Sequence, residues 1–241
     1  MTQLLKRATT ILALTALTAC IEPGDTTSST SAPSATQPTA PVAGTSGSVQ
    51  RFNRIVARME PIAENACRSR VRAGVNCDFK VVFDSNPRKP SNAYQSQDST
   101  GRPVLTFTAA LVAETKNDHE LAFIFGHEAA HHIRGHLTQT RQSATIGALA
   151  GGTLAVLLGG GQSAVDLGAD LGGTVGARAY SKDHELEADA LGARITQNAG
   201  YDAIKGAAFF QRIPDPGDRF LGSHPPNGQR IETVRRTVAS L

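Results

Sequence analysis

The sequence lacks an uninterrupted run of about 20 apolar residues, the length that a helix needs to span a bilayer. The N-terminal apolar stretch, 11–17, is too short. A second uncharged stretch, 142–165, is interrupted by glycines at 151–152 and 159–161 and holds few long aliphatic side chains. Neither stretch is therefore predicted to be a transmembrane helix.

The chain also lacks a basic tract. Its formal net charge is +3, and removal of residues 1–19, which hold Lys6 and Arg7, lowers this charge to +1. Without clustered positive charge, binding of nucleic acid has no electrostatic support. We therefore expect no nucleic-acid partner.

Cysteines are few, with three in 241 residues, and the first of them follows a targeting signal. Residues 1–19 have a basic start, an apolar stretch and small residues before Cys20, as secretory signal peptides do. The segment 17–20, with sequence LTAC, resembles a bacterial lipobox, in which the cysteine is acylated after cleavage on its N-terminal side. An ordinary secretory signal without lipidation is the alternative.

Acylation of Cys20 would supply more than one acyl chain, which gives stable membrane attachment. The next residue is Ile21 rather than an aspartate. In Gram-negative bacteria an aspartate at that position usually retains a lipoprotein in the inner membrane. We therefore expect a lipid-anchored protein on the periplasmic face of the envelope, at the outer membrane.

The two remaining cysteines are Cys67 and Cys77. In an oxidising compartment, two cysteines ten residues apart are predicted to form a disulfide rather than a metal site. Two separate thiols in a reducing compartment are the alternative, which the signal peptide argues against.

Large apolar side chains are almost absent from residues 20–48, which are mainly Ser, Thr, Pro, Ala and Gly. Such a segment buries too little surface to offset the entropy lost on ordering. It is predicted to be a flexible, lipidated linker. The folded domain is then expected to be 49–241.

Within this domain, hydrophobic periodicity predicts a mostly helical α+β fold with a small antiparallel sheet. Helices are expected at about 48–67, 109–114, 118–134, 182–197, 201–210 and 228–238, and strands at 79–83, 92–95 and 103–108. The Gly- and Ala-rich segment 142–179 is predicted to be a helical hairpin packed on the domain, because small residues permit close helix packing. An element that dips into or touches the membrane is the alternative.

The most informative motif is H-E-x-x-H, formed by His127, Glu128 and His131. On a helix, two residues four apart lie on one face, so both imidazoles can bind a single Zn²⁺. Glu128 is then positioned to polarise a bound water molecule. Asn117 or Asp118 can cap the start of this helix, and glycine at 135 can end it.

A third ligand must come from elsewhere in the chain. The extended motif H-E-x-x-H-x-x-G-x-x-H is excluded, because Arg134 and Leu137 occupy its last two positions. His136 is expected on the opposite face of the same helix and is a poor candidate. His132 is one step off the metal face and is predicted to be structural or exposed.

Acidic residues of the segment 183–189 offer the third ligand. Glu185 and Asp189 are four apart, so Asp189 can accept the outer N–H of a ligand histidine, most plausibly His127, while Glu185 binds metal. Spacing alone favours Glu185 only modestly over Glu187, which would point away and be exposed. His184 is a further possible ligand.

These motifs resemble one family. H-E-A-A-H-H, E-L-E-A-D at 185–189, Asn92-Ala93-Tyr94 and Tyr180-Ser181-Lys182 are similar to the gluzincin metallopeptidases that include HtpX, the CAAX prenyl protease and periplasmic BepA and LoiP. The similarity covers about 50–241. It implies a zincin-like domain that holds one Zn²⁺ per chain. The usual arginine is replaced by Lys182, and the chain has no 34-residue tetratricopeptide repeat.

The resemblance also implies roles for individual residues. It makes His127, His131 and Glu185 the metal ligands, Glu128 the general base, and Asp189 the partner of a ligand histidine.

Two further segments match the family pattern. The resemblance implies that His224, in a His-Pro segment followed by Arg230-Ile231, donates to the oxyanion or caps the metal at rest. A loop histidine beside a proline turn is the alternative. Asn92, Ala93 and Tyr94 resemble an edge strand that pairs with an extended substrate, although an edge strand needs no such role.

We therefore expect a zinc-dependent endopeptidase of the bacterial envelope that hydrolyses misfolded or misassembled envelope proteins. Its partners would be protein or peptide substrates, the membrane through Cys20, and envelope assembly machinery. The alternative is a zinc-containing lipoprotein that acts mainly as a chaperone or assembly factor. The sequence indicates no oligomeric state.

Overall fold

The structure is a computed structural model, and it describes residues 46–179, 181–217 and 224–241. The predicted signal segment 1–19, the lipidation site Cys20 and Tyr180 lie outside these residues. So does most of the predicted linker, but its last three residues belong to the first helix. The described fold therefore begins slightly earlier than predicted.

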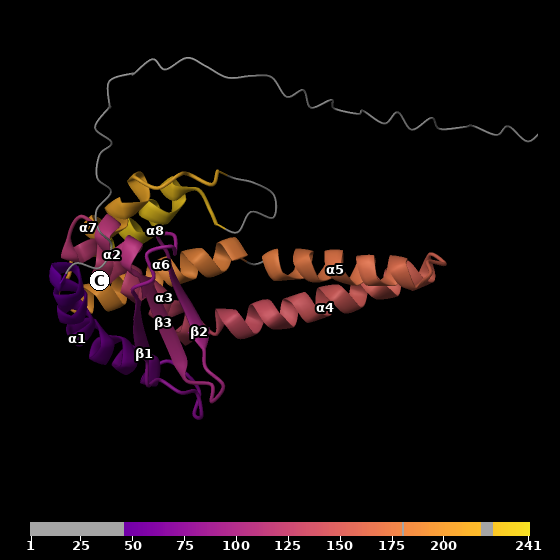
Figure 1. Ribbon diagram of the computed structural model, residues 1–241, viewed down its shortest axis with the longest axis horizontal. Helices are drawn as coiled ribbons and strands as arrows, with labels where there is room; N and C mark the ends of the chain where they lie inside the picture. The colour runs from indigo at the N-terminus through magenta and orange to yellow at the C-terminus, as the bar shows by residue number, and fades with distance from the viewer. Residues whose placement is uncertain (1–45, 180, 218–223) are drawn as a thin grey trace, which may run out of the picture. The chain divides into compact units, whose positions relative to one another are not determined.

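The α+β class is confirmed, with helices around a three-stranded sheet (Figure 1). In chain order the elements are α1 Ser46–Arg68, β1 Lys80–Asp84, β2 Ala93–Gln97, β3 Pro103–Thr108, α2 Ala109–Glu114, α3 Asp118–Arg134, α4 His136–Leu157, α5 Gln162–Arg178, α6 Ser181–Asn198, α7 Ala203–Ala207, the 3-10 helix η1 Ala208–Gln211, and α8 Asn227–Ala239. The segment predicted as one helix at 201–210 is therefore two, α7 and η1.

The sheet is mixed rather than antiparallel as predicted. Its strand order is β1-β3-β2. β2 and β3 form the expected hairpin, with Tyr94 opposite Thr106, whereas β1 and β3 are parallel, with Val82 opposite Thr106. The chain crosses from β1 to the far edge before it forms β2. β3 then returns between the two strands, in the direction of β1.

α3 is the buried centre of the domain. The side chain of Asn117 accepts a hydrogen bond from the backbone N–H of Glu120, and Gly135 ends the helix in the left-handed region with φ 73°. The run 121–125 is buried because α1, α6, α7, β2 and β3 all contact this helix. Phe125 stacks on Phe107 of β3 with 5.8 Å between ring centroids. A helix held on several sides provides a rigid support for side chains that bind metal.

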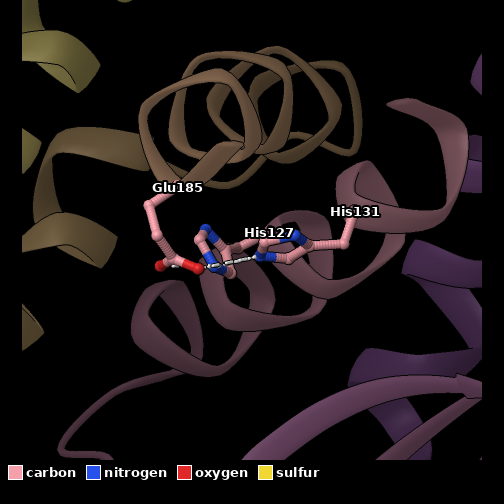
Figure 2. Close-up of side chains that lie close together, drawn as sticks. All are labelled: His127, His131 and Glu185. Atoms are coloured by element: carbon pink, nitrogen blue, oxygen red, sulfur yellow. Dashed lines mark hydrogen bonds and ion pairs between the residues drawn. The ribbon is translucent and has the colours of Figure 1, made fainter. Parts of the chain in front are cut away.

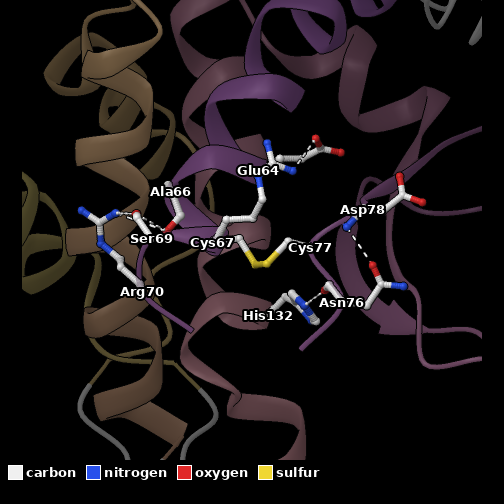
Figure 3. The surroundings of a disulfide bond; sticks show 10 residues. Glu64, Ala66, Cys67, Ser69, Arg70, Asn76, Cys77, Asp78 and His132 are labelled. Carbon is white, nitrogen blue, oxygen red and sulfur yellow. Dashed lines mark hydrogen bonds and ion pairs between the residues drawn. A yellow bond between two sulfur atoms is a disulfide. The ribbon is translucent and has the colours of Figure 1, made fainter. Parts of the chain in front are cut away.

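α1 covers one side of this core with its predicted apolar face, in which Phe52, Ile55 and Met59 are buried. At its end, Cys67 and Cys77 form a disulfide (Figure 3). The disulfide encloses the segment that leads to β1.

α4 and α5 lie side by side and form the predicted hairpin (Figure 1). Their backbones come so close that a Cβ on Gly151 would overlap the carbonyl of Gly168, and one on Gly147 that of Gly172. The prediction that the hairpin packs on the rest of the domain is wrong. Outside the hairpin, its main contacts join α4 to α3 and α5 to α6, and α5 has no buried residue. The glycines therefore allow close packing of α4 on α5 within the hairpin. In the part of the chain that the structure describes, no helix has the length and apolarity to cross a bilayer.

Candidate metal centre

α3 and α6 touch through two glycines, which brings the two halves of the site together. A Cβ on Gly192 would lie 2.7 Å from the backbone N of His127, and one on Gly126 would lie 2.7 Å from the carbonyl oxygen of Gly192. Only residues without side chains allow this approach. Because the helices are this close, Glu185 and Asp189 of α6 reach His127 of α3.

Three side chains converge as a group that can hold a metal ion (Figure 2). The Nε2 atoms of His127 and His131 are 3.0 Å apart. Glu185 places Oε2 3.5 Å from Nε2 of His127 and Oε1 3.3 Å from Nε2 of His131. Tetrahedral ligands about 2.0–2.1 Å from zinc are separated by about 3.3–3.4 Å. The donor set and its spacing therefore fit zinc.

The outer nitrogen of His127 is held by a buried carboxylate. Its Nδ1 lies 2.9 Å from Oδ1 of Asp189, which has no exposed surface. Arg230, on α8, donates from Nε to Oδ2 and from Nη2 to Oδ1 of Asp189, both at 2.7 Å. Burial raises the pKa of Asp189, but the Arg230 guanidinium and the His127 hydrogen bond outweigh burial and lower it. An ionised Asp189 fixes the His127 ring with Nε2 directed toward Glu185.

The two charged partners also change the protonation of the ligand set. Burial lowers the pKa of His127, but hydrogen bonds to Asp189 and Glu185 outweigh it and raise that pKa to about 10. Burial raises the pKa of Glu185, while hydrogen bonds from His127, His131 and His224 bring it well below its usual value. In the protein without metal, a proton therefore occupies the place that a metal ion would take.

Glu128 lies beside this group and lines a cleft of about 750 Å³. Its side chain is nearly buried, and His127, His131 and Glu185 line the same cleft. Asn92, Ala93 and Tyr94 also line this cleft. Ala93 and Tyr94 belong to β2, an edge strand in the described sheet. The cleft therefore connects a candidate metal site to a strand that can accept a further strand.

His224 also reaches the site. Its Nδ1 is 3.1 Å from Oε2 of Glu185, and half of its side chain is exposed.

Of the other candidates, His132 is structural: its Nε2 donates to the carbonyl of Asn76 at 2.7 Å. Glu187 is exposed, as predicted, with 52% of its side chain accessible.

Sequence reasoning placed His136 wrongly. It was expected on the far face of the metal helix, but it begins α4, where it is buried beside the site with Nδ1 2.9 Å from Nδ1 of His131. Burial, aided by His131 and His184, lowers its pKa to about 3, so it is neutral. The error arose because the helical period was extended past Gly135, whose left-handed backbone turns the chain.

Arg230 was also missed as part of the site. The sequence offered it only as half of an Arg-Ile pair near the C-terminus. Its guanidinium lies 3.9 Å from the centre of the Phe210 ring and 3.3 Å from Oε2 of Glu185. It therefore links α8 to Glu185 and Asp189 of α6.

The chain is similar to known proteins. A protein of Vibrio cholerae serotype O1 (strain ATCC 39315 / El Tor Inaba N16961), named "Putative beta-barrel assembly-enhancing protease", is 31% identical over 125 residues. That match covers 49% of this chain and 26% of the relative, so it extends over about a quarter of the relative's length. The model of peptidase family M48 matches residues 50–238. Because this match covers most of the chain, the protein belongs to peptidase family M48, a family of metallopeptidases.

Proposed function

We propose that the protein is a zinc-dependent endopeptidase of the bacterial cell envelope, acting on misfolded or misassembled envelope proteins. The convergence of His127, His131 and Glu185 beside Glu128 is the observation that carries this proposal. Membership of a metallopeptidase family supports the reaction class. One zinc ion is expected per chain.

His127, His131 and Glu185 would hold the zinc. Bound there, it would polarise the peptide carbonyl and lower the pKa of a water molecule to about 7. The Glu128 carboxylate would accept the proton of that water and deliver it to the nitrogen of the leaving amine.

Residues around the ligands would orient the reaction. Asp189 keeps the proton of His127 on Nδ1 and so leaves the Nε2 lone pair for the metal. Arg230 balances the charge of Asp189. His224 is close enough to the site to donate a hydrogen bond to the developing oxyanion.

The substrate would bind as an added strand along β2. The backbone O of Asn92 accepts from Thr108, and the N–H of Asp98 donates to Arg102, so even-numbered residues of this strand face β3. The N–H and C=O groups of Ala93 and Gln95 therefore point outward, beside the cleft. They can pair with an extended peptide irrespective of its sequence, which suits unfolded substrates.

The envelope location rests on the sequence. Residues 1–19 and Cys20 resemble a lipoprotein signal, which supports lipid attachment at the outer membrane. The disulfide of Cys67 and Cys77 suits an oxidising compartment. The name of the Vibrio cholerae relative supports a link to β-barrel assembly.

The test compares wild type with Glu128→Gln. Both proteins should bind one zinc per chain, while hydrolysis of unfolded casein should fall by about 10²–10⁴-fold in the variant. Glu232→Gln, the same change at an exposed position of α8, is the matched control and should leave hydrolysis unchanged. Wild-type hydrolysis by Glu128→Gln would refute the role of Glu128. Zinc binding without hydrolysis by the wild type would favour the chaperone alternative.

A further inference from the structure

The hairpin of α4 and α5 exposes an unusual amount of apolar surface. Most large apolar side chains that the described residues expose belong to it: Ile146, Leu149, Leu154, Val156, Leu157, Leu158, Leu167, Leu171 and Val175. Soluble surfaces rarely expose so many apolar side chains on one element without a binding role.

At the hairpin tip, which we define as residues 154–165, this surface covers the side of α4 that faces away from α5. Leu154, Val156, Leu157 and Leu158 are 57–78% exposed. At 100° per residue they span about 200° of the helix circumference. The remaining side, with Ala155, faces α5. A protein groove would cover one stripe of a helix. An apolar surface of this width instead matches a fluid apolar phase, while the exposed polar residues Gln162 and Ser163 at the start of α5 can stay among headgroups.

Charge and backbone pairing at the tip also suit removal from water. No ionisable residue occurs from 142 to 165, and the first beyond it are Asp166 and Asp170, both exposed. At the turn, the N–H groups of residues 158, 159 and 160 donate to the carbonyls of residues 154, 156 and 155 at 2.9–3.0 Å. Paired backbone groups lower the cost of leaving water.

We propose that the hairpin tip inserts into the boundary between headgroups and acyl chains of a lipid bilayer. Asp166 lies five residues beyond Gly161, so about 7.5 Å of helix can enter before a charge is buried. This depth lies within the roughly 5–10 Å reached by interfacial helices. The predicted acylation of Cys20 independently indicates that the chain works at a bilayer. Because the tip is uncharged, neutral lipids suffice.

The sequence contains no tryptophan, so a single one reports its own surroundings. The mature full chain carrying Leu157→Trp would be reconstituted into vesicles of phosphatidylcholine and phosphatidylethanolamine. We expect a blue shift of its emission and quenching by lipids brominated near the headgroup end of the acyl chain. Leu171→Trp is the matched control, because Leu171 is 59% exposed but lies beyond Asp166 and Asp170. Its emission should remain that of tryptophan in water.

A second pair of variants tests the chemistry of the tip. In the Leu157→Trp background, Leu158→Asp should abolish quenching by lipid, whereas Leu171→Asp should leave it unchanged. Both positions are exposed, so circular dichroism should match the parent. Three results would overturn the proposal: emission unshifted by vesicles, equal quenching at 157 and 171, or a concentration-dependent shift without lipid, which would indicate a second copy of the chain.

Discussion

His136 and His131 meet through their Nδ1 atoms, which are 2.9 Å apart although the residues belong to different helices. One of these nitrogens must donate and the other accept. If Nε2 of His131 offers its lone pair to a metal ion, the ring proton is on Nδ1, so Nδ1 of His131 is the donor and His136 the acceptor. The single ring proton of neutral His136 is then on Nε2, 3.5 Å from Oε2 of Glu187. Each ligand histidine therefore has its own outer partner.

We expect His136→Ala to weaken zinc binding by about 10–100-fold, as loss of such partners does. The zinc affinity of His136→Asn, whose side-chain oxygen can accept a hydrogen bond from His131, should lie between those of wild type and His136→Ala. Competition with a chelator of known affinity measures this. Equal zinc affinity in wild type and His136→Ala would show that His136 does not orient His131.

The contact of α3 with α6 should not tolerate one added methyl group. In Gly192→Ala the new Cβ meets backbone N and Cα of His127 at 2.7 and 2.9 Å, so α6 must shift and carry Glu185 with it. We expect a loss of stability of about 1–3 kcal/mol and weaker zinc binding. Gly228→Ala, in the first turn of α8, is the control, because a Cβ added there has no atom within 4 Å. This variant should keep both the stability and the zinc binding of wild type. Urea unfolding and zinc content per chain would be compared. Similar behaviour of the two variants would contradict the packing argument.

Zinc affinity should rise with pH. In the metal-free protein the pKa of His127 is raised to about 10, so zinc must displace a proton at neutral pH. One displaced proton makes binding about tenfold tighter per pH unit below that pKa. Calorimetry in buffers of different ionisation enthalpy would count the proton. No proton release at pH 7 would contradict the proposed protonation.

The same group predicts how the metal-free protein responds to pH. A folded pKa above the ordinary value of 6.5 adds stability below about pH 6.5, and this contribution is lost as pH rises through about 10. For protein stripped of metal with a chelator, the urea concentration at the unfolding midpoint should therefore decrease as the pH is raised from about 6.5 to about 10. With zinc bound, the midpoint should depend less on pH over this range.

The edge strand can be tested through one backbone donor. Gln95→Pro removes an N–H that points away from β3, and edge strands tolerate proline at such positions. If substrate pairs there, kcat/KM should fall by several-fold to about tenfold, the effect of one hydrogen bond. Gln95→Ala loses the same side chain but keeps the N–H, so it should resemble wild type. A similar loss in both variants would assign the effect to the side chain.

Local signals in the sequence predicted much of this fold. Asn117 and Gly135 determined the limits of α3, and the spacing of Phe52, Ile55 and Met59 predicted the buried face of α1. The helical period likewise placed Glu185 and Asp189 on one face of α6. These features depend on residues within one or two turns of each other.

Features that depend on distant contacts could not be predicted in this way. The parallel pairing of β1 with β3 follows from the path of the chain between them. The pair formed by Arg230 and Asp189 joins residues 41 apart, and nothing near either one indicates the other. His136 was misplaced because a single left-handed residue changes the direction of everything after it.

The disulfide also constrains how the protein should be prepared. It closes the segment that carries Asn76, whose carbonyl accepts from His132, the neighbour of a metal-site histidine (Figure 3). Material recovered from a reducing cytoplasm would lack this cross-link, and that end of α3 would lose part of its support. The export route used for expression therefore decides which molecule is assayed, and inactive cytoplasmic material would be no argument against the peptidase.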